Sequence, residues 1–236
     1  MSHDFQGSSL GLRNVKLLKD LPGERLEELA RRCTWRRFGP GQPIISREAQ
    51  DRNVYLLVAG RVRVTIYSAG GRQVTFRDFA PGEFFGEVAA IDEKPRSADV
   101  VALDSVLIAS MSPDAFRRLM LEEPLVGERV IRRLAGLVRL LSERVLDLST
   151  LGVQNRIQAE LLRHAREAGV KDNVARLHPA PKHADIASQI STYREQVTRE
   201  FSSLTKAGVL AKDGAALLVC DVAKLQRMVE EVRQAS

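Results

Sequence analysis

Short runs of residues with high β-propensity follow one another between positions 34 and 111, and this pattern restricts the fold more than any other feature. The clearest runs cover residues 54–59, 62–67, 73–79 and 100–109, and glycines punctuate them at positions 60, 70, 71 and 82. Tight turns between short strands need the positive backbone angles that glycine tolerates. Many short strands joined in this way are typical of a closed sandwich or barrel. We therefore predict a β-roll here, within an α+β chain.

A long helical pattern follows the predicted roll. After Pro124, apolar residues recur at spacings of three and four, at Val130, Leu134, Leu137, Leu141, Val145 and Leu148. This seam suits a parallel helix pair at a dimer axis, although a helix packed only on its own domain would use the same residues. Gly152 interrupts the pattern and predicts a hinge, because glycine in a helix interior costs about 1 kcal/mol relative to alanine. We predict a β-roll domain over 1–123, a dimerisation helix over 124–150 and a third domain over 151–236.

The third segment has the pattern of a winged helix-turn-helix. Residues 184–190 predict a short helix, and the capping-box spacing from Thr192 to Glu195 predicts the start of a second one. Residues 209–212 and 216–219 flank Asp213 and Gly214 and predict a hairpin wing. Asp221 is placed to cap a last helix that runs to position 232.

The second helix of this pair is amphipathic in a way that suits DNA reading. Val197, Phe201 and Leu204 share one face. The opposite face carries Arg194, Glu195, Thr198, Arg199 and Ser202. Arginine can clasp the two acceptors of a guanine edge, and glutamate can accept from the amino group of cytosine. If this helix is considered alone, the alternative interpretation is a charged face that is exposed to solvent and does not bind DNA.

Residues 85–100 predict a pocket for a small phosphate ester. Gly86 precedes a short helix-compatible run, so the backbone can approach an anion closely. Arg96 adds a planar donor suited to phosphate, and Ser97 adds a hydroxyl. Glu87 would repel a phosphate unless it faced a hydrogen-bond donor such as a sugar hydroxyl, and a cyclic nucleotide has both parts. The alternative is a turn closed by an ion pair between Glu87 and Arg96, with no ligand.

Composition narrows the function classes. The 236 residues are 44% hydrophobic, which suffices for two modest domains, and the net charge of +6 is compatible with nucleic acid binding. Two cysteines are too few for a disulfide framework, an iron–sulfur cluster or a structural zinc site. His178 and His183 have no third ligand nearby, so we predict no metal site. No run of about 18 apolar residues occurs, and we predict a cytoplasmic protein with no membrane partner.

The phosphate pocket resembles a known cassette. Gly-Glu, an apolar run and then Pro-Arg-Ser-Ala is similar to the phosphate-binding cassette of the cyclic-nucleotide-binding fold, a jelly roll. The resemblance implies that Gly86, Val88 and Ala98 line the ligand, that Glu87 takes the ribose 2′-hydroxyl, and that Arg96 and Ser97 hold the cyclic phosphate. Cyclic AMP or cyclic GMP would be the allosteric ligand, and no other cofactor is implied.

Residues 194–210 resemble the recognition helix of the cyclic AMP receptor protein and fumarate-nitrate regulator family of bacterial transcription factors. The resemblance rests on Arg194-Glu195-x-Val197-x-Arg199, then Leu204 and Ala207-Gly208-Val209-Leu210. It implies a homodimer on a palindromic double-stranded DNA site with half-sites like GTGA, and a contact with RNA polymerase. The DNA-binding residues would be Tyr193, Arg194, Glu195, Thr198 and Arg199. This family usually has glycine where Ser191 stands.

The family's long helix also contacts the nucleotide base, and here the matching positions are Leu141 and Ser142. Leu141 replaces a hydroxyl residue, so the base preference is open. A regulator that senses another ligand, or none, is the alternative within the family. An enzyme acting on cyclic nucleotides is the alternative outside it. The enzyme would need a metal cluster or a nucleophile with a base, and no His or Cys lies near the cassette, so we predict no catalytic residues.

Overall fold

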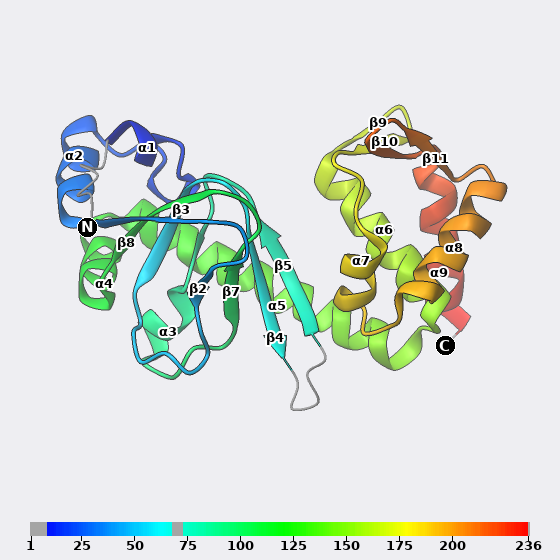
Figure 1. Cartoon of the computed structure of the whole chain (residues 1–236), viewed down its shortest axis with the longest axis horizontal. Helices are drawn as coiled ribbons and strands as arrows, with labels where there is room; N and C mark the ends of the chain where they lie inside the picture. Colours follow the sequence, from blue (N-terminus) through cyan, green and yellow to red (C-terminus); the bar gives the residue numbers. More distant parts are fainter. Residues whose placement is uncertain (1–8, 68–72, 236) are drawn as a thin grey trace. The chain divides into compact units, whose positions relative to one another are not determined.

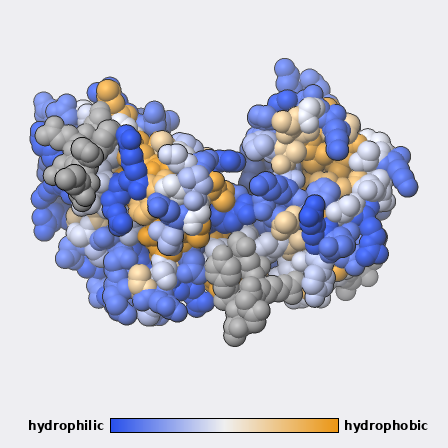
Figure 2. Space-filling view, in the orientation of Figure 1, coloured by the Kyte–Doolittle hydropathy of each residue, from blue (hydrophilic) through white to orange (hydrophobic). Residues whose placement is uncertain are grey.

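The computed structural model describes residues 9–67 and 73–235 (Figure 1). The chain forms two compact units, Met1–Gly136 and Leu137–Ser236, with the division inside one long helix. On the face shown in Figure 2, each unit has apolar areas that are bordered by hydrophilic residues. Among the described residues, no helix combines the length and the apolar character needed to span a membrane.

Two four-stranded antiparallel sheets form the centre of the first unit. Their strand orders are β1-β8-β3-β6 and β2-β7-β4-β5. The strands are β1 (Thr34–Phe38), β2 (Pro43–Ile45), β3 (Val54–Ala59), β4 (Val62–Tyr67), β5 (Gln73–Phe79), β6 (Phe84–Phe85), β7 (Asp99–Ala102) and β8 (Val106–Met111). The predicted β-roll is therefore present.

Alternating residues of the strands supply two separate cores. On β3, Tyr55 and Leu57 point between the two sheets, whereas Val54 and Leu56 point to a layer of helices. That layer consists of α1 (Ser9–Arg13), the 3-10 turn η1 (Lys16–Leu18), α2 (Gly23–Arg32), α4 (Pro113–Glu122) and the start of α5 (Pro124–Thr150). As predicted, Ser112 caps α4, where its side chain accepts a hydrogen bond from Ala115 N at 3.2 Å.

One predicted strand was wrong. The run 100–109 is two strands, β7 and β8, because a turn at positions 103–105 separates them. Asp104 accepts a hydrogen bond from Arg61 N at 2.7 Å, and Leu103 N donates to the carbonyl of Arg61 at 2.8 Å. These contacts hold the turn against the turn between β3 and β4. The chain therefore passes from one sheet to the other where hydrophobicity alone suggested one continuous strand.

Helix α5 is long, as predicted, but its apolar residues serve more than one surface. Val130 is 2% exposed and belongs to the core of the roll, and Leu134 packs against the same core. Ile131, Val138 and Val145 are more than 60% exposed. Val130 therefore does not belong to the exposed seam in which we predicted it. Helix α5 ends at Thr150, next to the predicted break at Gly152.

The second unit packs helices against a small antiparallel sheet of order β11-β12-β10-β9. Its elements after α5 are α6 (Val153–Ala168), β9 (Val170–Lys171), β10 (Val174–Leu177), α7 (His183–Gln189), α8 (Arg194–Lys206), β11 (Leu210–Asp213), β12 (Ala216–Val219) and α9 (Val222–Ala235). The hairpin of β11 and β12 and the capping of α9 by Asp221 were predicted, and Asp221 accepts from Lys224 N at 2.8 Å. The pair β9 and β10 was not predicted.

Candidate functional sites: a ligand pocket and a nucleic-acid interface

Gly86 lies at the centre of the predicted cassette, between β6 and the short helix α3 (Glu87–Asp92). Its φ is +87°, in the left-handed region that favours glycine. A Cβ atom on this residue would lie 2.7 Å from the carbonyl oxygen of Asn53. Both the conformation and the crowded space therefore require glycine, which lets this turn pack closely against Asn53 and Arg96.

Arg96 is held in the floor of this cassette. Its side chain is only 2% exposed. One terminal nitrogen donates to the carbonyl of Gly86 at 3.0 Å, and the other donates to the carbonyl of Asn53 at 2.9 Å and to Asp51 Oδ1 at 2.7 Å. Arg96 Nε is buried and has no acceptor among the described residues. The guanidinium thus keeps one unused buried donor that an anion can satisfy.

Asp51 accepts a hydrogen bond from Arg96, and we did not predict this role from the sequence. Its carboxylate also accepts from the hydroxyl of Tyr55 at 2.9 Å, and the Arg96 guanidinium lies 5.7 Å from the centre of the Tyr55 ring. Burial disfavours the ionised form of Asp51, but hydrogen bonds from Arg96 and Tyr55 outweigh it and hold its pKa below the usual value. Burial, together with the Asp51 carboxylate, raises the pKa of Tyr55 to about 12. Near neutral pH Asp51 is therefore a carboxylate and Tyr55 a neutral phenol.

Glu87 is paired with a residue of the long helix. Its side chain is 7% exposed, and Oε1 accepts from Arg133 Nε at 3.1 Å. The Arg133 guanidinium also lies over the rings of Phe79 and Phe84, at 4.9 and 4.3 Å from their centres. The ion pair between Glu87 and Arg96 that we kept as an alternative is therefore absent, since each residue has a different partner. Arg133, on α5, gave no signal in the sequence.

The remaining predicted ligand residues fall into two groups. Val88 and Ala98 are partly buried and Ser97 is exposed, all in the first unit beside Gly86, Glu87 and Arg96. Leu141 and Ser142 belong to the second unit and are exposed on α5. The Ser142 hydroxyl donates to the carbonyl of Val138 at 2.9 Å, within its own helix.

The turn between α7 and α8 departs from the predicted capping box. Helix α8 begins at Arg194, Tyr193 is its N-cap, and no side chain caps it. Ser191 has φ +57°, and Thr192 N donates to the carbonyl of Ala187 at 2.9 Å. The backbone itself closes the turn, so the helix starts later than the Thr192 cap implied. The left-handed angle also explains why glycine suits the position of Ser191.

Helix α8 divides into a buried and an exposed face. Val197, Phe201 and Leu204 lie in the core of the second unit, each at most 7% exposed. The predicted DNA-binding residues Tyr193, Arg194, Glu195, Thr198 and Arg199 are all exposed. This arrangement matches the predicted faces and leaves side chains of both charges available to a partner.

Thr198, on the exposed face of α8, contacts a residue of α7. Its hydroxyl donates to the carbonyl of Arg194 at 3.0 Å and lies 2.8 Å from His183 Nδ1. The His183 ring also meets the Phe201 ring edge-on, with centres 4.6 Å apart. Burial, with the nearby charges of Arg194 and Lys212, lowers the pKa of His183. His183, the first residue of α7, therefore supports α8.

Two family models match the chain, and together they cover both units. The cyclic nucleotide-binding domain matches residues 35–123, and the Crp-like helix-turn-helix domain matches residues 155–228. Within the described residues, no group of three His, Cys, Asp or Glu side chains is placed to hold a metal ion.

Relatives that match most of this chain show which family it belongs to. The cyclic AMP receptor protein of Thermus thermophilus is 30% identical over 198 residues, which is 82% of this chain and 87% of the relative. The CRP-like cAMP-activated global transcriptional regulator of Mycobacterium tuberculosis is 25% identical over 191 residues, 80% of this chain and 85% of the relative. A solved structure of a CooA mutant from Carboxydothermus hydrogenoformans shares the fold, with a TM-score of 0.78 at 19% identity over 96% of this chain and 98% of that one. The chain therefore belongs to the cyclic AMP receptor protein and fumarate-nitrate regulator family of transcription regulators.

Proposed function

We propose that this chain is a homodimeric transcription regulator whose β-roll binds cyclic AMP or cyclic GMP and whose helix α8 reads a palindromic DNA site. The observation that carries the proposal is the cassette: the left-handed turn at Gly86, the adjacent Glu87, and a buried Arg96 with an unused donor. The exposed polar face of α8 supplies the second function in the same chain. RNA polymerase is the expected further partner, and the cytoplasm is the expected location.

The chemistry of the cassette suits a cyclic nucleotide better than a simple anion. Arg96 is the cation for the phosphate, and Ser97 is exposed beside it. Among the described residues only Oε1 of Glu87 accepts a hydrogen bond, so Oε2 is left for a donor on the ligand. The hydroxyls of inorganic phosphate belong to an anion that this carboxylate repels, whereas a ribose hydroxyl donates from an uncharged group. An enzymatic role has no such support, and the relatives named above are regulators.

A heptad pattern on α5 supports the homodimer. The a positions are all β-branched and the d positions are all leucine: Ile131, Val138 and Val145, then Leu134, Leu141 and Leu148. This choice of residues favours a two-stranded parallel coiled coil. Five of the six are at least 38% exposed, and Leu134 packs partly on the roll. The proposed seam replaces the one predicted through Val130 and Leu137.

We expect both cyclic nucleotides to bind, with cyclic AMP the tighter by about two- to twelvefold. Cassette contacts to sugar and phosphate are the same for both. Ser142 already donates its proton to Val138, so its oxygen is left as an acceptor for the 6-amino group of adenine. One neutral hydrogen bond contributes about 0.5 to 1.5 kcal/mol. Calorimetric titration of the wild type, Leu141→Thr and Ser142→Ala with each nucleotide measures this, and Ser142→Ala should remove the preference.

A wild-type protein that excluded one nucleotide by more than about a thousandfold would show that another residue reads the base, since a single neutral hydrogen bond is too weak. If neither nucleotide bound while the protein was folded and dimeric, the ligand assignment would fail. The regulator would then sense another ligand or none.

Arg194→Ala is expected to cost about 1 to 3 kcal/mol at the cognate DNA site and to relax the base preference at one position, because a bidentate contact to guanine is lost. Arg199→Ala should behave similarly at another position. Lys206→Ala, at the last residue of α8, is the control and should weaken all sequences alike if it touches phosphate at all. Gel shifts with substituted half-sites distinguish the cases. Equal weakening of random and cognate DNA by Arg194→Ala would rule out base reading by this residue.

A further inference from the structure

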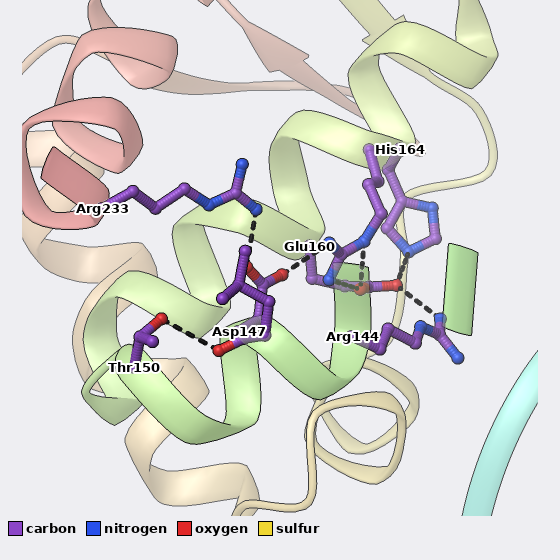
Figure 3. Close-up of polar contacts among 8 residues, drawn as sticks. Arg144, Asp147, Thr150, Glu160, His164 and Arg233 are labelled. Atoms are coloured by element: carbon purple, nitrogen blue, oxygen red, sulfur yellow. Dashed lines mark hydrogen bonds and ion pairs between the residues drawn. The ribbon is translucent and has the colours of Figure 1, made fainter. Parts of the chain in front are cut away.

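A buried chain of alternating charges lies in the second unit (Figure 3). Asp147 accepts from Arg233 at 2.6 Å on Oδ1 and from Arg163 at 2.8 Å on Oδ2. Glu160 accepts from Arg163 at 2.6 Å on Oε2 and from Arg144 at 3.3 Å on Oε1. We call these five residues the corner network. The carboxylates are 2% and 3% exposed, so the network is part of the interior.

The corner network joins three helices across the break at Gly152. Arg144 and Asp147 stand in the last two turns of α5, and Glu160 and Arg163 stand on α6. Only Leu151 and Gly152 separate the two helices, and Leu151 is 4% exposed in the core of the unit. Arg233 adds an ion pair from α9 to Asp147. The break is therefore braced on both sides, which differs from the free hinge that Gly152 alone suggested.

The ion pairs of the corner network stabilise the charged side chains in one arrangement. Burial disfavours the charged form of Arg163, but Glu160 and Asp147 outweigh it and raise its pKa. Replacing a buried ion pair by apolar groups is often neutral or stabilising, so stability alone does not account for five charges at one corner. Ionic contacts with defined directions do, however, fix one arrangement of the helices that carry them.

Helix α6 also contacts α8 through buried side chains, so the position of α8 depends on that of α6. Gln158, on α6, donates to Glu200 of α8 at 2.7 Å, and both side chains are at most 5% exposed. Ile157 of α6 and Val197 of α8 are fully buried in the same core. Helix α8 is thus fixed to α6, and α6 is fixed to the end of α5. That end carries Leu141, Val145 and Leu148 of the proposed dimer seam.

We propose that the corner network determines which spacing between two DNA half-sites the protein accepts. The proposal rests on the homodimer proposed above. In a two-fold dimer built on the α5 seam, the separation of the two copies of α8 depends on the angle between α5 and α6. One added base pair moves a half-site by about 3.4 Å and turns it by about 35°. A braced corner rejects that change, whereas a loosened corner accommodates it.

The test compares full-length variants on palindromic operators selected with the wild type. Each operator is made at its selected spacing and with one base pair inserted or removed between the half-sites. Asp147→Asn removes the carboxylate charge between Arg163 and Arg233. Arg233→Gln removes only the contact from α9, and its side chain is 34% exposed and easier to replace. Glu230→Gln is the matched control on α9, because its exposed carboxylate accepts only from Gln226 among the described residues.

We expect the wild type and Glu230→Gln to show the same ratio of affinities between the selected and the altered spacings. In Asp147→Asn and Arg233→Gln this ratio should fall by about tenfold, within the range of changes in coupling between sites. Base preference within each half-site should stay the same, which separates spacing from general loss of fold. Thermal unfolding identifies any variant that does not fold, and Arg233→Gln decides if Asp147→Asn fails.

An unchanged spacing ratio in folded, dimeric Arg233→Gln and Asp147→Asn overturns the role of the network and leaves the proposed function intact. A wild type that is monomeric on DNA, as seen by sedimentation, overturns both proposals. The two failures are therefore distinguishable.

Discussion

Arg96→Ala is expected to lower the affinity for cyclic AMP at least tenfold, because the cyclic phosphate loses a charged hydrogen-bond donor worth roughly 1.5 to 3 kcal/mol. The structure adds a second effect. The same side chain donates to the carbonyls of Gly86 and Asn53 and to Asp51. Carbonyls that lose a buried partner cost about 1 to 3 kcal/mol, so the free energy of unfolding should also fall. Calorimetric titration and thermal unfolding measure the two effects separately.

Asp51→Asn separates the two effects. It weakens the support of Arg96 but removes a negative charge near the expected phosphate, so we expect lower stability with little or no loss of affinity. Asp51 is 39% exposed, so the new amide keeps contact with water, whereas the buried Arg96 loses its carboxylate partner, which is why stability should fall. If Arg96→Ala lost affinity only through unfolding, Asp51→Asn at equal stability would lose as much. Wild-type affinity in folded Arg96→Ala would show that the phosphate site lies elsewhere.

The parts of the pocket that the sequence analysis found are those that lie close together along the chain. Gly86 and Glu87 are adjacent, Arg96 follows 10 residues after Gly86, and Ser97 is next to it. Their residue types suggest a phosphate ester directly. Asp51 and Arg133 are 45 and 46 residues from the side chains they contact. Single acidic and basic residues at such separations carry no signal, because only the paired strands and α5 bring them to the cassette.

The exposed stripe of α5 shows a different limit of prediction from sequence. Val130 and Ile131 are both apolar, and periodicity alone cannot decide which of two neighbouring positions faces the roll. The structure buries Val130 and exposes Ile131, and this moves the exposed stripe by one position toward a regular heptad. The helix and its approximate ends were predictable from spacing, whereas the face it presents depended on packing against α4 and the roll.

Short elements and local caps were the least predictable. Strand β9 contains two residues, too few for an alternating pattern. Strand β10 alternates between exposed and buried residues, but it has only four residues and its first exposed residue is the apolar Val174. The expected cap of Thr192 failed because Ser191 adopts a left-handed angle and Thr192 pairs through its backbone. In contrast, the exposed face of α8 was correct, since three buried apolar positions at helical spacing determine where the polar residues point.

Val138→Glu is expected to raise the dissociation constant of the proposed dimer on the order of a hundredfold or more. Val138 is 63% exposed in the single chain and stands at an a position, so two glutamates would meet across the seam without a partner. The fold of each chain should be unaffected, because the side chain is largely exposed. Affinity for a palindromic operator should fall with the dimer, while binding to one half-site remains weak and unchanged.

Leu146→Glu is the matched control for this prediction, since Leu146 is 52% exposed on the same helix but lies outside the a and d positions. It introduces the same charge without placing it in the seam, so its dissociation constant should stay close to that of the wild type. Analytical ultracentrifugation over a range of protein concentrations measures both variants. If Val138→Glu and Leu146→Glu dissociated alike, the exposed stripe of α5 would not be the dimer interface, and another surface would have to hold the two copies at the spacing of a palindrome.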